Sequence, residues 1–109
     1  MSRQKYAEEM LYQCLLTLAH NIPVEEKIHH VWSLYLCHVD PLDVPGVIRG
    51  GYNELRTVID ELFCSAGKGI TQKVYFQLFI QLTDLHREIV RWNALENYIT
   101  ISRQEMMHG

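Results

Sequence analysis

The sequence predicts an all-α fold: a compact bundle of four main helices with an optional short C-terminal turn, formed as a single helical domain by residues 1–109. Three observations lead to this prediction. In four segments the apolar residues recur at intervals of three and four, the period of a helix that buries one side. Clusters of proline, glycine and small polar residues separate these segments. No segment shows the alternation and tight hairpin turns that are typical of strands.

The first helix is expected over residues 3–20, with Ser2 as its N-cap. On a helical wheel of about 100° per residue, one side collects the apolar residues Ala7, Met10, Leu11, Cys14, Leu15, Leu18 and Ala19. Tyr12 and Leu16 lie at the flank of this side. We therefore expect both of these side chains to project beyond the core.

The second helix is expected over residues 23–39. Pro23 suits a first turn, because the N–H that proline lacks would have no intrahelical partner there. The buried stripe is predicted to contain Ile28, Val31, Trp32, Tyr35, Leu36 and Val39. The helix must end near Val39, since Pro41 disfavours helical geometry at Asp40.

The third helix follows the loop 40–46 and opens at Asp43 or Val44, followed by Pro45. Its apolar positions are Val47, Ile48, Tyr52, Leu55, Val58, Ile59, Leu62 and Phe63. The pair 50–51, two glycines, leaves two alternatives open: a continuous or kinked helix, or a short turn followed by a break. Because the wheel places Gly51 within the apolar side, we expect a neighbouring helix to approach closely there.

The segment 65–69 ends the third helix, with glycine available for the left-handed position after the helix end. Thr71 can then cap a fourth helix that runs to about Tyr98. Its core stripe is predicted to be Val74, Leu78, Leu82, Leu85, Ile89 and Trp92. The β-branched run 99–101 weakens the helix, and Ser102 with Glu105 can cap one further turn.

The composition is that of an ordinary globular protein, with 48% hydrophobic residues and a net charge of −3. A negative chain has no electrostatic reason to approach nucleic acid, so we expect no direct nucleic-acid binding. The start shows no secretory signal, and no stretch is long and apolar enough for a membrane span. The three cysteines, Cys14, Cys37 and Cys64, are predicted to be reduced, which favours the cytoplasm.

The six histidines do not form a recognisable metal motif, and we expect neither a metal nor another cofactor. Glu26 and His29 have the Glu-x-x-His spacing of di-iron bundles, but the chain has no second copy of that motif. On the predicted second helix His29, His30 and His38 point in three different directions. They therefore cannot meet at one ion.

No residues are predicted to be catalytic. Cys37 and His38 are adjacent, so on a helix they diverge by about 100° and cannot activate each other. The segment 67–71 resembles a phosphate loop only faintly, because the spacing and the preceding strand are missing. The candidate acid–base carboxylates are expected on solvated polar sides, and they are Asp60, Glu61, Asp84 and Glu88.

A helix–turn–helix interpretation would make the fourth helix the recognition helix. Its first turns carry Tyr75, Phe76 and Phe79 instead of the polar and basic side chains that read base edges. Direct DNA binding is therefore disfavoured.

The fourth helix is apolar around too much of its circumference for a surface helix, since seven of nine residues in 74–82 are apolar. This surplus has two explanations: the helix lies in the centre of the bundle, or a second face is bound by a partner. We favour the second and predict a protein interface formed by Tyr12, Leu16, Phe76, Phe79 and Ile80. We also expect a homodimer, in which two copies each offer the apolar face of the fourth helix to a two-fold contact.

In size, charge and helical content the chain resembles the small helical antagonists that bacteria use to sequester transcription factors, and no residue role follows from this resemblance. We therefore expect a non-enzymatic cytoplasmic regulator that binds another protein, such as a transcription regulator whose dimer interface it occludes. The alternative is a small helical ligand carrier or enzyme. Its pocket would lie between the helices and would be lined by Trp32, Tyr35, Tyr52 and Trp92.

Overall fold

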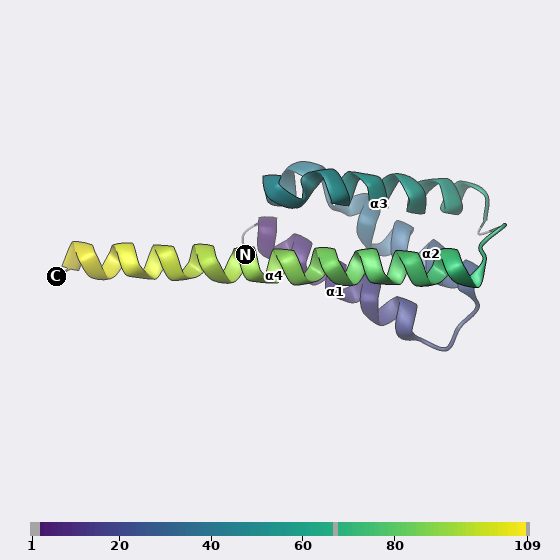
Figure 1. Cartoon of the computed structure of the whole chain (residues 1–109), viewed down its shortest axis with the longest axis horizontal. Helices are drawn as coiled ribbons and strands as arrows, with labels where there is room; N and C mark the ends of the chain where they lie inside the picture. The colour runs from purple at the N-terminus through teal and green to yellow at the C-terminus, as the bar shows by residue number, and fades with distance from the viewer. Residues whose placement is uncertain (1–2, 67, 109) are drawn as a thin grey trace.

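The computed structural model describes residues 3–66 and 68–108, and it confirms the predicted all-α bundle (Figure 1). Every regular element in these residues is helical. The main helices are α1 (Arg3–Ala19), α2 (Val24–His30), α3 (Gly46–Cys64) and α4 (Gln72–His108). Three short helical elements connect α2 to α3, and these are η1 (Val31–Tyr35), η2 (Leu36–His38) and η3 (Pro41–Asp43). The predicted N-cap of the first helix, Ser2, lies outside the described residues.

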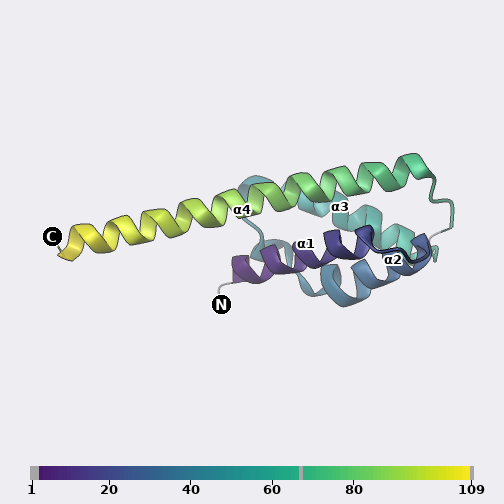
Figure 2. The same cartoon turned by 90° about the horizontal axis from the view of Figure 1, so that it is seen from below.

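Helix α4 is the longest element, and the other helices all lie on one side of it (Figure 2). Both α1 and α3 run antiparallel to α4. The amide of Asn93 near the middle of α4 contacts the start of α1 at Gln4, whereas Tyr75 contacts its end at Leu18. The core lies between α4 and the other helices. Its apolar residues are Ala7, Leu11, Cys14, Leu18, Ile28, Val31, Leu36, Val39, Val44, Ile48, Tyr52, Leu55, Ile59, Leu78, Leu82, Leu85 and Ile89.

The predicted second helix is not one regular α-helix. It changes at Val31 into a π-helical turn, η1, and then into the 3₁₀ turn η2. The Ser33 hydroxyl donates to the His29 carbonyl at 2.6 Å, and the Cys37 thiol donates to the Ser33 carbonyl at 3.3 Å. Trp32 and Tyr35, which were expected in the buried stripe, are only partly buried.

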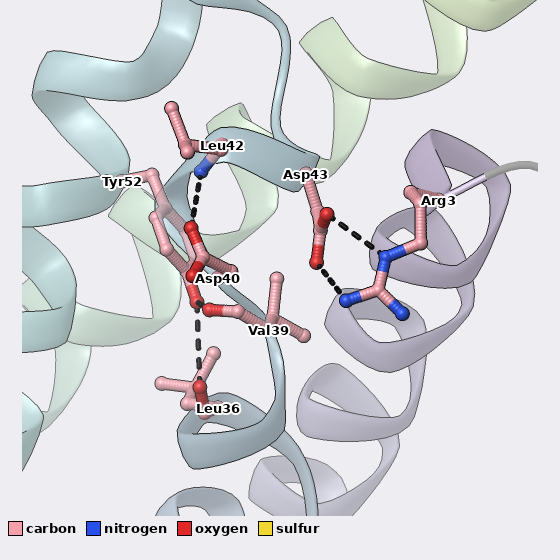
Figure 3. Close-up of polar contacts among 7 residues, drawn as sticks. All are labelled: Arg3, Leu36, Val39, Asp40, Leu42, Asp43 and Tyr52. Atoms are coloured by element: carbon pink, nitrogen blue, oxygen red, sulfur yellow. Dashed lines mark hydrogen bonds and ion pairs between the residues drawn. The ribbon is translucent and has the colours of Figure 1, made fainter.

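The sequence allowed Asp43 to open the third helix, but in the structure Asp43 does not cap it. Helix α3 begins at Gly46 with Pro45 at its N-cap. Asp43 is instead 8% exposed and accepts two hydrogen bonds from Arg3, from Nε at 3.0 Å and from Nη2 at 2.9 Å (Figure 3). This bidentate pair attaches the start of α1 to the loop before α3. The hydrogen bonds that Arg3 donates to Asp43, and the negative charge of that carboxylate, raise the pKa of Arg3.

The same loop is held from inside by Tyr52. Its buried hydroxyl donates to the Val39 carbonyl at 2.7 Å, and the Leu36 carbonyl lies 3.4 Å away (Figure 3). Burial raises the pKa of Tyr52, so the hydroxyl keeps its proton and remains a donor. Asp40 completes the loop by accepting a hydrogen bond from the Leu42 amide at 2.8 Å.

A second polar contact joins three helices at the other end of the bundle. Lys27 of α2 donates from Nζ to the Leu18 carbonyl at 2.8 Å and to the Tyr75 hydroxyl at 3.0 Å. Tyr75 of α4 also donates to the Leu18 carbonyl. A cation beside the last carbonyls of α1 is favourable, because those groups have no partner within their own helix.

Helix α3 passes through Gly50 and Gly51 without a break, so the continuous alternative is confirmed. A Cβ atom at Gly51 would lie 3.4 Å from Cδ2 of Leu85 in α4, whereas one at Gly50 would have no neighbour within 4 Å. Gly51 is nevertheless exposed, so it lies at the margin of the α3–α4 contact and not in its centre.

Two described residues between α3 and α4 have a positive φ, Ala66 at 56° and Gly69 at 83°, and Gly67 lies outside the described residues. The Ser65 amide bonds the Glu61 carbonyl and the Ala66 amide bonds the Phe63 carbonyl, both at 3.1 Å. These bonds close the helix end, and the strained backbone falls on an alanine. Thr71 caps α4 as predicted, accepting from the Val74 amide at 3.2 Å.

The sequence predicted that the fourth helix would weaken after about Tyr98. In the structure α4 instead continues to His108. The hydroxyl of Thr100 donates to the Glu96 carbonyl at 2.9 Å, and β-branched residues cost only a few tenths of a kcal/mol each, about 0.7 at most. The last part of α4 extends beyond the other helices (Figure 1). The molecule is therefore 59 Å long, and its radius of gyration is 16.0 Å. A packed chain of this length has about 13 Å.

The two glycines of α3 provide a test of the continuous helix. Gly50→Ala should raise the free energy of unfolding by about 0.5–1 kcal/mol, because the helical backbone is kept and the site is open. Gly51→Ala should raise the free energy of unfolding by less. Gly51→Leu should be the least stable of the three variants, because its larger side chain meets Leu85. Urea unfolding followed by circular dichroism gives the order. A loss with Gly50→Ala would show that the helix does not pass through this pair.

The strained residue after α3 provides a second test. Ala66→Gly should raise the free energy of unfolding by about 0.5–1 kcal/mol, because glycine adopts a positive φ without the steric cost that alanine bears. Ser65→Gly is the matched control, since its φ of −88° is open to any residue. The control should be destabilising in the same urea titration. Equal losses in both variants would contradict a left-handed residue at position 66.

Candidate interaction surface

The side of α4 that faces away from α1 and α3 carries large apolar side chains in solvent. Phe76 is 53% exposed and Ile80, one turn later, is 59% exposed. Further along the helix Tyr98 is 69% exposed. We call this side the outer face of α4 and define it by its exposed apolar residues, which are Phe76, Ile80, Val90, Leu95, Tyr98 and Ile101. Isolated exposed apolar residues are ordinary, but a row of them along one helix is typical of an interface.

Half of the outer face belongs to the part of α4 that no other helix covers. Asn93 is the last buried residue within 68–104, and its amide donates to the Gln4 carbonyl at 3.3 Å and to the Glu8 carboxylate at 3.1 Å. We call residues 94–104 the overhang. Beside it lies a hollow of about 410 Å³, lined by Trp92, Leu95, Glu96, Ile99, Thr100 and Arg103. The sequence predicted helix as far as about Tyr98, but it did not predict that this part of α4 lies beyond the other helices.

The five residues predicted as an interface occupy four different places. Phe76 and Ile80 lie on the outer face of α4, as expected. Phe79 is partly buried and packs against the core. Tyr12 is 44% exposed on α1, with its ring 5.9 Å from that of His86. Leu16 lines a separate hollow whose other residues come from α1 and from the segment 22–35. The structure therefore brings two of the five together.

Ile80 also lies beside a shallow groove between α3 and α4. The groove has a volume of about 410 Å³, and its lining residues are Val58, Val74, Gln77, Leu78, Ile80 and Gln81. Two glutamines at its edge supply amide donors and acceptors next to the apolar side chains. An apolar floor with a few polar groups at the rim suits the side chain of a partner helix.

The middle of the exposed side of α4 is charged. Asp84 pairs with Arg87 at 3.8 Å, and Glu88 pairs with Arg91 at 3.3 Å. All four side chains are about half exposed or more. Exposed pairs of this kind contribute little to folding, so these charges remain available to a partner.

The residues considered for chemistry are dispersed. Cys14 is buried, which raises the pKa of its thiol and makes it a poor nucleophile. Cys37 donates to a backbone carbonyl, and His29 stacks on Phe63 with ring centres 5.4 Å apart. Within residues 3–66 and 68–104, no group of three or more histidine, cysteine or acidic side chains could hold a metal ion.

The four aromatic residues of the carrier alternative do not share a pocket. Trp32 lies under the guanidinium of Arg56, 5.5 Å from it, in a hollow on α3. Tyr35 lines the hollow beside α1, and Trp92 lines the one beside the overhang. Tyr52 is buried and bonded to the backbone of the loop before α3.

Comparisons of the chain with known protein families, with curated proteins and with solved structures gave no match. Among the described residues, no helix has both the length and the apolar character needed to cross a bilayer. The surface of the molecule is therefore the basis for proposing a function.

The dispersed histidines and cysteines lead to a test for metal. Treatment with a chelator should leave the thermal unfolding midpoint unchanged, because no metal is expected to contribute to folding. Differential scanning fluorimetry measures the midpoint, and metal analysis of the purified protein is the companion measurement. A large fall in the midpoint, together with stoichiometric zinc or iron, would contradict this expectation.

Proposed function

We propose that this chain is a non-enzymatic cytoplasmic regulator that binds another protein through the outer face of α4. In this proposal the chain sequesters its partner, for example by covering the dimer interface of a transcription regulator. Such a protein acts as an antiactivator without touching DNA. Binding between proteins needs no cofactor, and the proposal includes none.

One observation carries this proposal: large apolar side chains stay exposed along a single helix, α4, whose opposite side packs on the core as far as Asn93. Phe76 and Ile80 lie one turn apart, which is the spacing that a partner helix reads. Burying each of them would contribute about 1.5–3 kcal/mol. A few such residues commonly dominate an interface.

The position of the surface suits a competitor. Helix α4 extends past the bundle, so a partner can lie along the helix without meeting α1 or α3 (Figure 2). A partner that dimerises through an amphipathic helix would find in α4 a replacement for its own second copy. Occlusion of this kind requires only one exposed helix, and a chain of 109 residues is long enough to supply it.

The outer face of α4 can be tested by substitution. Phe76→Asp and Ile80→Asp should each weaken partner binding by about 10- to 100-fold, which corresponds to the loss of one buried apolar side chain. Tagged protein is first used to capture partners from cells of the source organism. The captured partner is then titrated against each purified variant by isothermal calorimetry, and circular dichroism reports whether the helices are kept.

Val47→Asp is the matched control, because Val47 is 72% exposed, lies in the first turn of α3 and does not belong to the outer face of α4. This variant should bind like the original protein. Equal binding by the Phe76→Asp and Ile80→Asp variants would remove the outer face from the proposal. A loss of activity on substituting His29 or Cys37 instead would point to a chemical site.

A further inference from the structure

We infer that the outer face of α4 is covered, in the free protein, by the same face of a second copy, with the two α4 helices antiparallel. This inference rests on the proposed function, because it names a competing occupant of the same surface. It commits to one geometry: the two-fold axis passes between Arg87 and Glu88. The charges on the helix, the apolar residues on either side of them and the overhang support this geometry independently.

The charges are self-complementary only in the antiparallel direction. Along the exposed side of α4 they read Asp84, Arg87, Glu88 and Arg91, which is negative, positive, negative, positive. When the order is reversed about its midpoint, every charge meets its opposite. Asp84 then faces Arg91 of the second copy, and Arg87 faces its Glu88. In a parallel pair each charge would meet its own copy, which is unfavourable.

The apolar residues pair in the same register. Ile80 comes four residues before Asp84, and Leu95 comes four residues after Arg91. The register that matches the charges therefore places Ile80 of one copy opposite Leu95 of the other. Both side chains are exposed, at 59% and 52%.

At about 100° per residue, Ile80, Leu95 and the four charged residues lie within an arc of about 100° on α4. They can therefore face one partner helix at the same time. A two-fold contact repeats every pair, so the interface contains a charged centre and one apolar patch at each end.

The overhang gives this interface its length. In the proposed register residues 72–103 of one α4 lie against residues 103–72 of the other, over about 48 Å of helix. The overhang of each copy then lies along the bundle of its partner, where Phe76 and Ile80 are exposed. Helices α1 and α3 lie on the opposite side of α4, so the two bundles do not meet (Figure 2). Dimer formation and partner binding would thus exclude each other.

Disulfide formation between engineered cysteines tests the direction and the register of the two α4 helices. The background carries Cys37→Ser and Cys64→Ser, and Cys14 is buried. A mixture of the Ile80→Cys and Leu95→Cys variants should form a mixed disulfide dimer on oxidation. Neither variant should link to itself, because equivalent positions are about 22 Å apart along the axis, whereas a disulfide needs Cα atoms within about 7 Å. Self-linking of each variant would overturn the antiparallel direction.

Charge reversal tests the centre without removing an apolar side chain. The variant Arg87→Glu/Arg91→Glu should be monomeric, and so should Asp84→Arg/Glu88→Arg, because each presents four like charges to itself. A 1:1 mixture should restore a dimer, which a misfolded variant could not do. Sedimentation velocity measures the mass, and the original chain should report about twice its 12.8 kDa at micromolar concentration. Homodimers of either variant alone would overturn the register.

The two proposals fail separately. An original chain that remains monomeric at several hundred micromolar would overturn the dimer, while the effect of Phe76→Asp on partner binding would still decide the proposed function. If a dimer forms as described but no partner binding depends on Phe76, the outer face of α4 serves self-association alone. Tighter partner binding by the charge-reversed monomers than by the original chain would be expected when the dimer competes with the partner.

Discussion

The packing of α1 and α3 against a single side of α4 is the constraint on which the rest of the structure depends. A helix of 37 residues can be buried all round only if elements surround it, and the described part of the chain places no helix on the free side of α4 (Figure 2). Leu78, Leu82, Leu85 and Ile89 fill the contact with the bundle. The surplus apolar residues of α4 consequently face solvent. The properties of the candidate surface follow from this asymmetry.

Polar contacts between distant segments determine how the smaller helices lie beneath α4. Arg3 holds Asp43, and the Tyr52 hydroxyl holds the carbonyl of Val39. Lys27 joins the end of α1 to Tyr75 at the start of α4. Buried polar groups are costly when they lack partners, so each of these bonds disfavours an alternative register of the helices. The bundle can thus present α4 in one orientation although its core is small.

A surface of this kind has a regulatory consequence. An apolar helix that is exposed in a free protein is an aggregation hazard unless something covers it. Covering by a second copy would keep the protein soluble and would make the exposed form available only at low concentration or in the presence of a stronger partner. Charged residues at the centre of the face contribute direction more than affinity, because exposed ion pairs are weak. The apolar ends would supply most of the binding free energy.

The sequence by itself determined the number, order and class of the helices, because periodicity, proline and capping residues act locally. Thr71 caps α4, and α3 runs through Gly50 and Gly51, as local patterns had indicated. The sequence also identified Phe76 and Ile80 as surplus, since the wheel separates them from the core stripe.

Only the tertiary structure decided which of the remaining residues share a surface. Phe79 differs little from Phe76 in local sequence, yet packing against the core covers it. Asp43 became the partner of Arg3, forty positions away, and not a helix cap. The continuation of α4 to His108 and the exposure of Leu95 and Tyr98 depend on where the bundle ends. Local patterns cannot supply that position, because it is determined by contacts between residues that are far apart in the chain.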